Sequence, residues 1–506
     1  MKPGARSIIG ACLAASKCLA IDTISPDLIE ADISTTELEG ILLDLNNIAD
    51  ANGGNRAFGL PGYKASVDYV LERIGSAATT TTTATTATVT NESSALKTWV
   101  QPFNHTFEQT RAISVTGPEG EDVYVLTLMY NTATPLPDGV TVPLIDTPVD
   151  DTRGSGCFAD QWEGIDATGR IALVKRGVCA ISDKLKLARA AGALAALVYQ
   201  SQPGTDFSSA TLSAENLGLL IPAGLIPLEV AQAWQARLAA GEEVSATLLV
   251  DAISDTRESW NVISETTEGD PDNVVVLGAH LDSVQAGAGV NDDGSGTAGL
   301  LAIINSVRKY TGLKNKVRFA WWGAEESGLI GSLYYTRSLP VEEANKIKYY
   351  FNYDMIGSPF PVFAVYQNEN SGGPADGLVE YLTAQGKDSY FGSFGTGSDY
   401  VGFLNLGIPS SGIFTGAGAP TDPCYHLACD TVTNVDYEAL TLNTKAAGRL
   451  AAQLALSLDG VPSRNTTSAN LRGRMKITES FGKWARAEER VVLQKSCSHD
   501  TQNQLI

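Results

Sequence analysis

The chain has 506 residues, of which 43% are hydrophobic and 18% are charged, and its formal net charge is −21. This composition is typical of a globular protein with sizeable cores, and it excludes a largely disordered chain. Nucleic-acid binders need Lys and Arg to neutralise phosphates, so the acidic balance argues against a nucleic-acid partner. At about 150 residues per domain, the length predicts roughly three domains.

The N-terminus has the pattern of a secretory signal peptide. Lys2 and Arg6 precede an apolar stretch at 7–16, and the small residue Ala20 ends the segment. We expect residues 1–20 to be a signal peptide, with a plain helix as the alternative, and the protein to be secreted, with the vacuole as the alternative location. Beyond this segment no uncharged apolar run reaches the ~20 residues that span a membrane, so no membrane partner is expected.

The cysteines and sequons fit an exported protein. Once the signal is removed, two local disulfides and a leftover Cys497 are the simplest account, with buried free thiols as the alternative. The expected pairs are Cys157–Cys179 and Cys424–Cys429. Asn-x-Ser/Thr sequons, which predict glycosylation, occur at Asn91, Asn104 and Asn465.

The first half of the chain is predicted to contain two units. Residues 21–130 mix helical and loop patterns, and the threonine-rich tract 79–90 is predicted to be a surface insertion, since it lacks large side chains to bury. Residues 131–252 are predicted to be a small α+β unit with strands at 171–174 and 195–199. A helix is expected between these strands.

From 253 to 458, strands and helices alternate, which predicts an open α/β sheet with helices on both faces. Buried-type strands are expected at 274–277, 317–321 and 348–352, and a helix at 295–310. The C-terminal extension 459–506 is predicted to be a helix followed by a loose tail.

Polar side chains follow each of these three strands. His280 and Asp282 follow the first strand, Glu325 and Glu326 the second, and Asp354 the third. Functional groups in open α/β folds lie beyond the carboxyl ends of the strands, so we expect these side chains at one edge of the sheet.

Two further groups complete a candidate metal site. Asp292 lies in a glycine-rich turn, and His426, one of only four histidines, lies between Cys424 and Cys429. Imidazole and carboxylate are the usual ligands of catalytic zinc. Singly, each group could be a core histidine, a turn-forming aspartate or a surface glutamate. Jointly, two histidines and three carboxylates suffice for two metals that share one carboxylate.

Five motifs resemble those of the two-zinc leucyl aminopeptidases of the aminopeptidase Y and secreted bacterial type: GAHLDS (278–283), GVNDDGSG (289–296), WWGAEESGLIGS (321–332), YFNYDMIG (350–357) and CYHLACDT (424–431). Residues 169–200 resemble a protease-associated (PA) domain. The resemblance implies a zinc exopeptidase fold, with a mixed, mostly parallel central sheet flanked by helices. The PA domain, at 131–252, would be inserted before the catalytic region 253–458.

The resemblance also implies two Zn²⁺ ions per chain. His280 and Asp354 would bind one ion, Glu326 and His426 would bind the other, and Asp292 would bridge them and precede a cis peptide bond. The Cys424–Cys429 disulfide would hold the His426 loop, and Cys157–Cys179 would belong to the PA domain.

Three residues are given catalytic roles by the same resemblance. Glu325 would be the general base, Tyr425 would stabilise the oxyanion, and Asp282 would hydrogen-bond His280 and fix its orientation.

The implied activity is that of a monomeric aminopeptidase acting on peptides or proteins with a free N-terminus, preferring large hydrophobic residues such as Leu. Two departures bear on specificity: Gly397 stands where many relatives have an Arg, and the segment 416–422 is short. The alternatives are a dipeptidase or carboxypeptidase on the same scaffold, or a catalytically silent PA-domain binding protein.

Overall fold

The computed structural model describes residues 22–75, 95–205 and 210–466. The predicted signal peptide, the threonine-rich tract with Asn91, and the chain from residue 467 with Cys497 lie outside the described residues. Residues 459–466 contain no helix or strand. Among the described helices, none is long and apolar enough to cross a membrane.

The α-helices are α1 (Pro26–Asp32), α2 (Thr35–Ala51), α3 (Pro61–Arg73), α4 (Ile181–Ala190), α5 (Leu228–Ala239), α6 (Gly294–Val307), α7 (Ile330–Ser338), α8 (Val341–Lys346), α9 (Gly373–Ala384), α10 (Tyr400–Asn405) and α11 (Tyr437–Leu456). The strands are β1 (Leu96–Thr116), β2 (Asp122–Val123), β3 (Val140–Asp146), β4 (Ile171–Lys175), β5 (Ala195–Tyr199), β6 (Ala223–Ile226), β7 (Ser245–Thr266), β8 (Asp270–His280), β9 (Asn315–Trp322), β10 (Ile347–Tyr353), β11 (Phe363–Gln367), β12 (Ser389–Ser393) and β13 (Ser410–Phe414).

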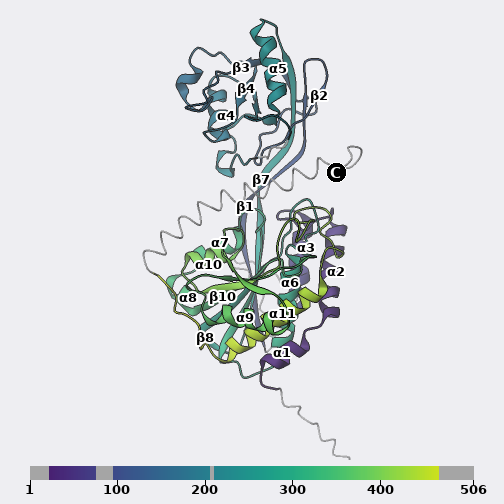
Figure 1. The fold of residues 1–506 in the computed structure, drawn as a ribbon, viewed down its shortest axis with the longest axis vertical. Helices are drawn as coiled ribbons and strands as arrows, with labels where there is room; N and C mark the ends of the chain where they lie inside the picture. Colours follow the sequence, from purple (N-terminus) through teal and green to yellow (C-terminus); the bar gives the residue numbers. More distant parts are fainter. Residues whose placement is uncertain (1–21, 76–94, 206–209, 467–506) are drawn as a thin grey trace, which may run out of the picture.

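A larger and a smaller lobe are joined by the long antiparallel strands β1 and β7 (Figure 1). The ladder runs from Leu96 opposite Thr266 to Thr116 opposite Thr247. One end of β7 pairs with β9 in the larger lobe, and the other end pairs with β3 in the smaller one. β7 passes residues 252 and 253 without a break. The proposed domain boundary there stays a prediction.

The larger lobe contains the sheet β12-β11-β13-β10-β8-β9-β7. β13, β10, β8 and β9 run parallel, whereas β7 is antiparallel to β9 and β11 is antiparallel to β13. The predicted mixed, mostly parallel sheet is therefore confirmed. The carboxyl ends of β8, β9 and β10 meet at one edge because these strands are parallel neighbours.

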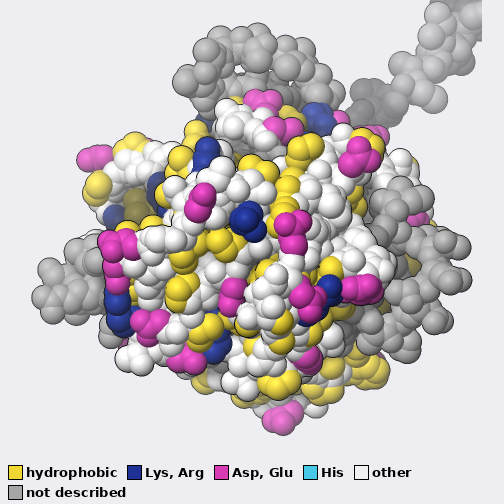
Figure 2. All heavy atoms as spheres, turned by 90° about the horizontal axis from the view of Figure 1, so that it is seen from above, with side chains coloured by type: hydrophobic (Ala, Val, Ile, Leu, Met, Phe, Trp, Pro, Cys, Tyr) yellow, Lys and Arg dark blue, Asp and Glu magenta, His cyan; other side chains and the backbone are white. Residues whose placement is uncertain are grey.

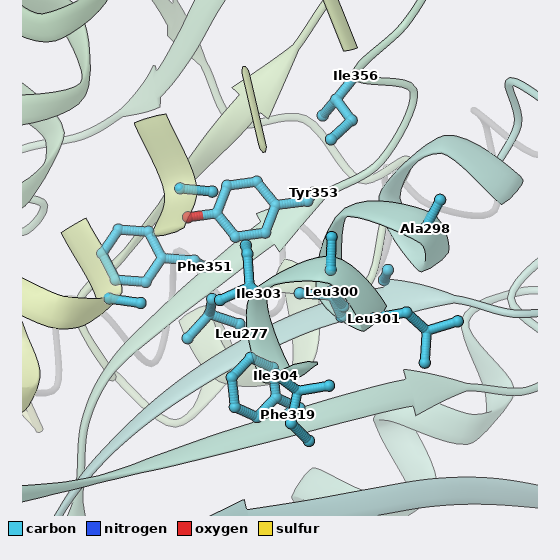
Figure 3. Close-up of a cluster of buried hydrophobic side chains, with 14 of the residues drawn as sticks. Leu277, Ala298, Leu300, Leu301, Ile303, Ile304, Phe319, Phe351, Tyr353 and Ile356 are labelled. Atoms are coloured by element: carbon cyan, nitrogen blue, oxygen red, sulfur yellow. The ribbon is translucent and has the colours of Figure 1, made fainter. Parts of the chain in front are cut away.

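Both faces of this sheet are buried, which explains the near-continuous apolar strands. Alternate residues of β8, such as Leu277, pack with α6 in the main core, and those between them, such as Val276, pack with residues of α7 and α10 on the other face. Figure 3 shows Ile303 and Ile304 of α6 lying over the sheet beside Leu277 and Phe319. The predicted strands and the helix near 295–310 are confirmed, with the helix ending at Val307.

The smaller lobe contains the parallel strands β3-β4-β5-β6, with cores that include residues of α4 and α5. The predicted Cys157–Cys179 disulfide is present. Beside it, the buried ammonium of Lys184 donates to the carbonyl of Ser155 and lies 3.4 Å from the Cys157 sulfur. Burial lowers the pKa of Lys184 to about 8.

Acidic, basic and apolar side chains are interspersed on the face of the molecule seen in Figure 2.

We expect Lys184→Met to flatten the pH dependence of stability between about pH 8 and pH 10. The folded-state pKa of Lys184, near 8, lies below its usual value of 10.5, so the unfolded chain binds more protons in this interval and wild-type stability rises with pH. Urea unfolding at several pH values measures this slope. Lys186→Met, on the same helix, is the control, because its side chain is 41% exposed, and it should retain the slope. An unchanged slope in Lys184→Met would contradict the assignment.

Candidate active site

The three parallel strands bring their polar ends together as predicted. β8 ends at His280, which pairs with Trp322 at the end of β9. β10 is in register with β8 on its other side, with Asn352 opposite Gly278. Because the strand ends are level, the residues that follow β9 and β10 lie beside His280.

Two groups of donor atoms share one carboxylate. His280 Nε2 lies 3.1 Å from one oxygen of Asp292 and 3.6 Å from Asp354 Oδ1. His426 Nε2 lies 3.2 Å from the other oxygen of Asp292 and 3.0 Å from Glu326 Oε2. Within each group of three residues, the ligand atoms lie within 4.8 Å of one another. Asp292 therefore faces both histidines, with one oxygen toward each.

The buried ionisable groups of the site shift one another's pKa values. Burial alone would lower the pKa of His280, but Glu325, Asp354 and Asp292 raise it well above its usual value. Burial alone would raise the pKa of Asp292, but its hydrogen bonds and attraction to His280 and His426 lower it. Protons and metal ions compete for such donors, so the same arrangement that favours imidazolium also favours a bound cation.

The donor set fits a pair of divalent cations. Each group offers histidine and carboxylate ligands and has three protein donors, the number found at catalytic zinc sites that keep a position open. Moreover, the Oε1 atoms of Glu325 and Glu326 are buried and make no hydrogen bond within the described residues. Both residues line a cavity, where a cation or a water could satisfy these atoms.

The turns that hold these groups have unusual backbone conformations. Ala324, Met355 and His426 have φ between 55° and 58°, a left-handed region that residues other than Gly seldom adopt. Ala324 precedes Glu325, and Met355 follows Asp354. Such residues cluster at functional sites. The predicted Cys424–Cys429 disulfide encloses His426, and the predicted cis peptide bond follows Asp292.

The contact between Asp282 and His280 differs from the predicted one. His280 Nδ1 lies 3.0 Å from the backbone carbonyl of Asp282, not from its carboxylate, whose nearest oxygen is 3.8 Å away. The carboxylate instead accepts from the backbone N–H groups of Glu325, at 3.0 Å, and Glu326, at 3.3 Å. These donors hold both oxygens toward the β9 turn, so the side chain supports that turn and the backbone orients the histidine.

Asp293 supports the site although no role was predicted for it. Its carboxylate accepts from the backbone N–H of His280 at 3.0 Å, of Met355 at 3.2 Å and of Gly296 at 2.8 Å. It is the N-cap of α6. An aspartate before a helix is a recognisable capping signal, but its contacts to the ends of β8 and β10 could not be read from it.

A chain of buried hydrogen bonds ends on Asp354. Ser398 donates to Asp354 Oδ2, and Asn352 donates to Ser398 at 2.7 Å. Tyr350 donates to Asn352 at 2.9 Å, and the indole N–H of Trp322 donates to Tyr350 at 3.1 Å. Partners of this kind fix the orientation of a ligand carboxylate.

Arg56 supports the loop between His280 and Asp292. Its fully buried guanidinium donates to the backbone carbonyls of Leu281, Ala288 and Gly289. Arg56 lies more than 220 residues before these acceptors. No local sequence pattern indicated this contact.

The donor groups open into a cavity of about 360 Å³. Glu325 and Tyr425 line it together with both donor groups. The rest of the lining is mostly aromatic, apolar or small: Met355, Ala364, Tyr366, Tyr390, Gly392, Ser393, Gly395, Thr396, Gly397, Tyr400, Phe414 and Ala417. No Lys or Arg is among the described residues that line it. The cavity has the size and polarity of a small-ligand site.

Histidine and carboxylate donors at the strand ends of an α/β sheet are the arrangement expected of a metal-dependent enzyme. The family model for peptidase family M28 matches residues 261–451, and that for the PA domain matches residues 140–234. The chain belongs to peptidase family M28 and contains a PA domain, which confirms the family predicted from the motifs.

The chain is similar to several aminopeptidases. It is 33% identical over 521 residues to the probable leucine aminopeptidase 2 of Aspergillus oryzae, covering 98% of this chain and 99% of that protein. It is 38% identical over 311 residues to aminopeptidase Y of Saccharomyces cerevisiae, covering 59% and 58%. Among solved structures, the aminopeptidase from Aneurinibacillus sp. strain AM-1 has a TM-score of 0.64 at 25% identity, covering 88% and 98%.

We expect Ser398→Ala to weaken Zn²⁺ binding by about 10- to 100-fold, because Asp354 loses the donor that orients it. Competition with a chromogenic chelator measures the affinity. Ser410→Ala removes another buried hydroxyl, which donates to the carbonyl of Ile408 and not to Asp354, and should leave the affinity unchanged. Equal affinities for Ser398→Ala and wild type would show that Ser398 does not support the site.

Proposed function

We propose that this chain is a zinc aminopeptidase that removes large hydrophobic residues such as Leu from the N-termini of peptides and proteins. The main support is the position of Asp292 between two histidine and carboxylate pairs in one cavity. Two Zn²⁺ ions would be held, one by His280 and Asp354 and the other by Glu326 and His426, with Asp292 shared.

Glu325 is the proposed general base. When bound, the zinc pair would polarise the scissile carbonyl and lower the pKa of a water molecule. Glu325 Oε2 lies 4.0 Å from His280 Nε2, beside the donor groups but in neither of them. Burial raises the pKa of Glu325 well above its usual value. In its ionised form, a carboxylate so placed can take a proton from water and pass it to the leaving amine.

Tyr425 is the proposed oxyanion donor. Its ring is buried and stacks on His426 with 3.8 Å between the ring centroids, so its position is tied to that of the metal ligand. It also lines the cavity. A phenol hydroxyl near the scissile carbonyl would stabilise the negative charge that develops on the carbonyl oxygen.

The charge of the cavity favours an aminopeptidase over a carboxypeptidase. A carboxypeptidase needs a cation for the terminal carboxylate of its substrate, and no Lys or Arg is found in the described lining. The lining is instead acidic, since among the described residues its charged side chains outside the donor groups are limited to Glu325, and such a site would accept a free α-amino group. A catalytically silent binding protein is also disfavoured, because both donor groups and Glu325 are present.

The lining supports the preference for large hydrophobic residues. Tyr366, Tyr390 and Phe414 offer apolar surface, and Gly397 adds no charged side chain where many relatives have an Arg. Burial of an aliphatic side chain against such surface contributes about 1.5–3 kcal/mol.

Export and glycosylation also belong to this proposal. The two disulfides suit an oxidising compartment, which supports secretion or a vacuolar location. Asn104 is exposed on β1 and Asn465 is half-buried. We propose that the protein acts as a monomer, which light scattering of the purified protein would test.

The proposed function is tested with a Leu-initiated peptide and its N-acetylated twin, each incubated with the zinc-loaded enzyme. We expect release of Leu from the free peptide only, because the acetyl group removes the cationic amine. Cleavage of both peptides at an internal bond would contradict an aminopeptidase. Cleavage of neither, with zinc bound, would contradict the peptidase assignment for this substrate class.

We expect Glu325→Gln to retain zinc but to lose at least about 100-fold in kcat, the typical scale for loss of a general base. Zinc content is measured by atomic absorption and kcat with the Leu-initiated peptide. Glu342→Gln, at an exposed position of α8, is the control and should behave as wild type. Near-normal turnover of Glu325→Gln would remove this residue from the mechanism.

A further inference from the structure

Both carboxylate oxygens of Asp430 accept hydrogen bonds from the backbone at Asp292, the ligand residue that the two donor groups share. Oδ1 accepts from the backbone N–H of Asn291 at 2.9 Å, and Oδ2 accepts from that of Asp292 at 3.0 Å. The carbonyl of Asp430 also accepts from the backbone N–H of Val290, at 3.3 Å. Three consecutive N–H groups of the loop that ends in Asp292 are thus bound by one residue.

This residue lies on the loop of the other histidine. Asp430 follows His426 by four positions and directly follows Cys429, which closes the loop with Cys424. The contact therefore joins the loop of Asp292 to that of His426. At this junction His426 Nε2 lies 3.2 Å from Asp292 Oδ2.

A buried polar network surrounds the contact. The amide nitrogen of Asn434 donates to Asp430 at 3.3 Å and to Asp422 at 2.8 Å. Asp422 also accepts from the side chain of Asn291, at 2.7 Å. All four residues are at most 7% exposed. Asp422 accepts from the backbone N–H of Cys424 at 3.0 Å, but it reaches the loop of Asp292 only through the side chain of Asn291 and has no bond to the backbone of Asp292.

We propose that Asp430 is a positioning residue of the metal centre, which fixes the shared ligand Asp292 at the spacing that His426 requires. This inference rests on the proposed function, because it takes the two donor groups as the zinc site. A carboxylate that accepts two backbone N–H bonds forms a strong, directional clamp. Residues that orient metal ligands in this way typically change metal affinity by about 10- to 100-fold when they are replaced.

The test compares zinc binding by wild type, Asp430→Asn and Asp422→Asn in the full chain. Chelator competition gives the zinc affinity, and thermal midpoints with added zinc and with excess chelator give the zinc-dependent stabilisation. In Asp430→Asn the amide nitrogen replaces an acceptor that faces a backbone N–H. We expect a 10- to 100-fold loss of zinc affinity and a smaller midpoint shift on zinc addition.

Asp422→Asn is the matched control, since this aspartate has similar burial and belongs to the same network. It should lower the midpoints with and without zinc alike and keep the zinc-dependent shift. An equal loss of affinity in both variants would overturn the proposal and assign the effect to the network as a whole. Wild-type affinity in Asp430→Asn would overturn it as well.

The same experiment separates this inference from the proposed function. Absence of zinc binding by wild type would refute the metal centre itself, whereas normal binding by wild type and Asp430→Asn alike would refute only the role of Asp430. If Asp430→Asn does not fold, Asp430→Glu replaces it with the same expectations. Its longer side chain keeps the charge but shifts the carboxylate relative to the two N–H groups.

Discussion

The site depends on a buried carboxylate, Asp292, that must face two imidazoles at once. Burying a carboxylate is costly unless charges and hydrogen bonds compensate for the lost water. Here His280 and His426 each face one oxygen of Asp292, and Asp430 accepts from its backbone N–H. His280 comes from the end of β8, whereas His426 and Asp430 come from the disulfide loop and the residue after it. The centre therefore forms only when this loop has packed against the end of β8.

The register of the central sheet brings the other donors to the same place. β8, β9 and β10 are parallel neighbours whose carboxyl ends are level, so short turns suffice to present Glu325, Glu326 and Asp354. The turns adopt left-handed conformations next to these carboxylates, and Asp282 and Asp293 hold them through backbone N–H groups. Asp282 and Asp293, which do not belong to the donor groups, thus fix the backbone beside the carboxylates that do.

The two lobes share structural elements near the site. The strands β1 and β7 extend into the smaller lobe, while Phe103 and Phe107 of β1 pack with Phe58 and with Ala324, the residue before Glu325. Arg257 of β7 lies 3.6 Å above the ring of Phe107. The strands that support the PA domain therefore also pack against the turn that presents the proposed base. This packing is consistent with a continuous ladder rather than a flexible linker.

The sequence by itself determined the three strands that end at the site, the candidate donor residues and the disulfide pairs, because each has a local signal: an apolar run, a polar group at its end, or two nearby cysteines. The long strands β1 and β7 were not predicted. The tertiary structure alone decided which residues hold these donors in place. Arg56, Ser398 and Asp430 act on groups that lie 44 or more residues away, and Asp282 orients His280 through its carbonyl rather than its side chain. Such contacts depend on how loops meet in space, and no spacing along the chain encodes that.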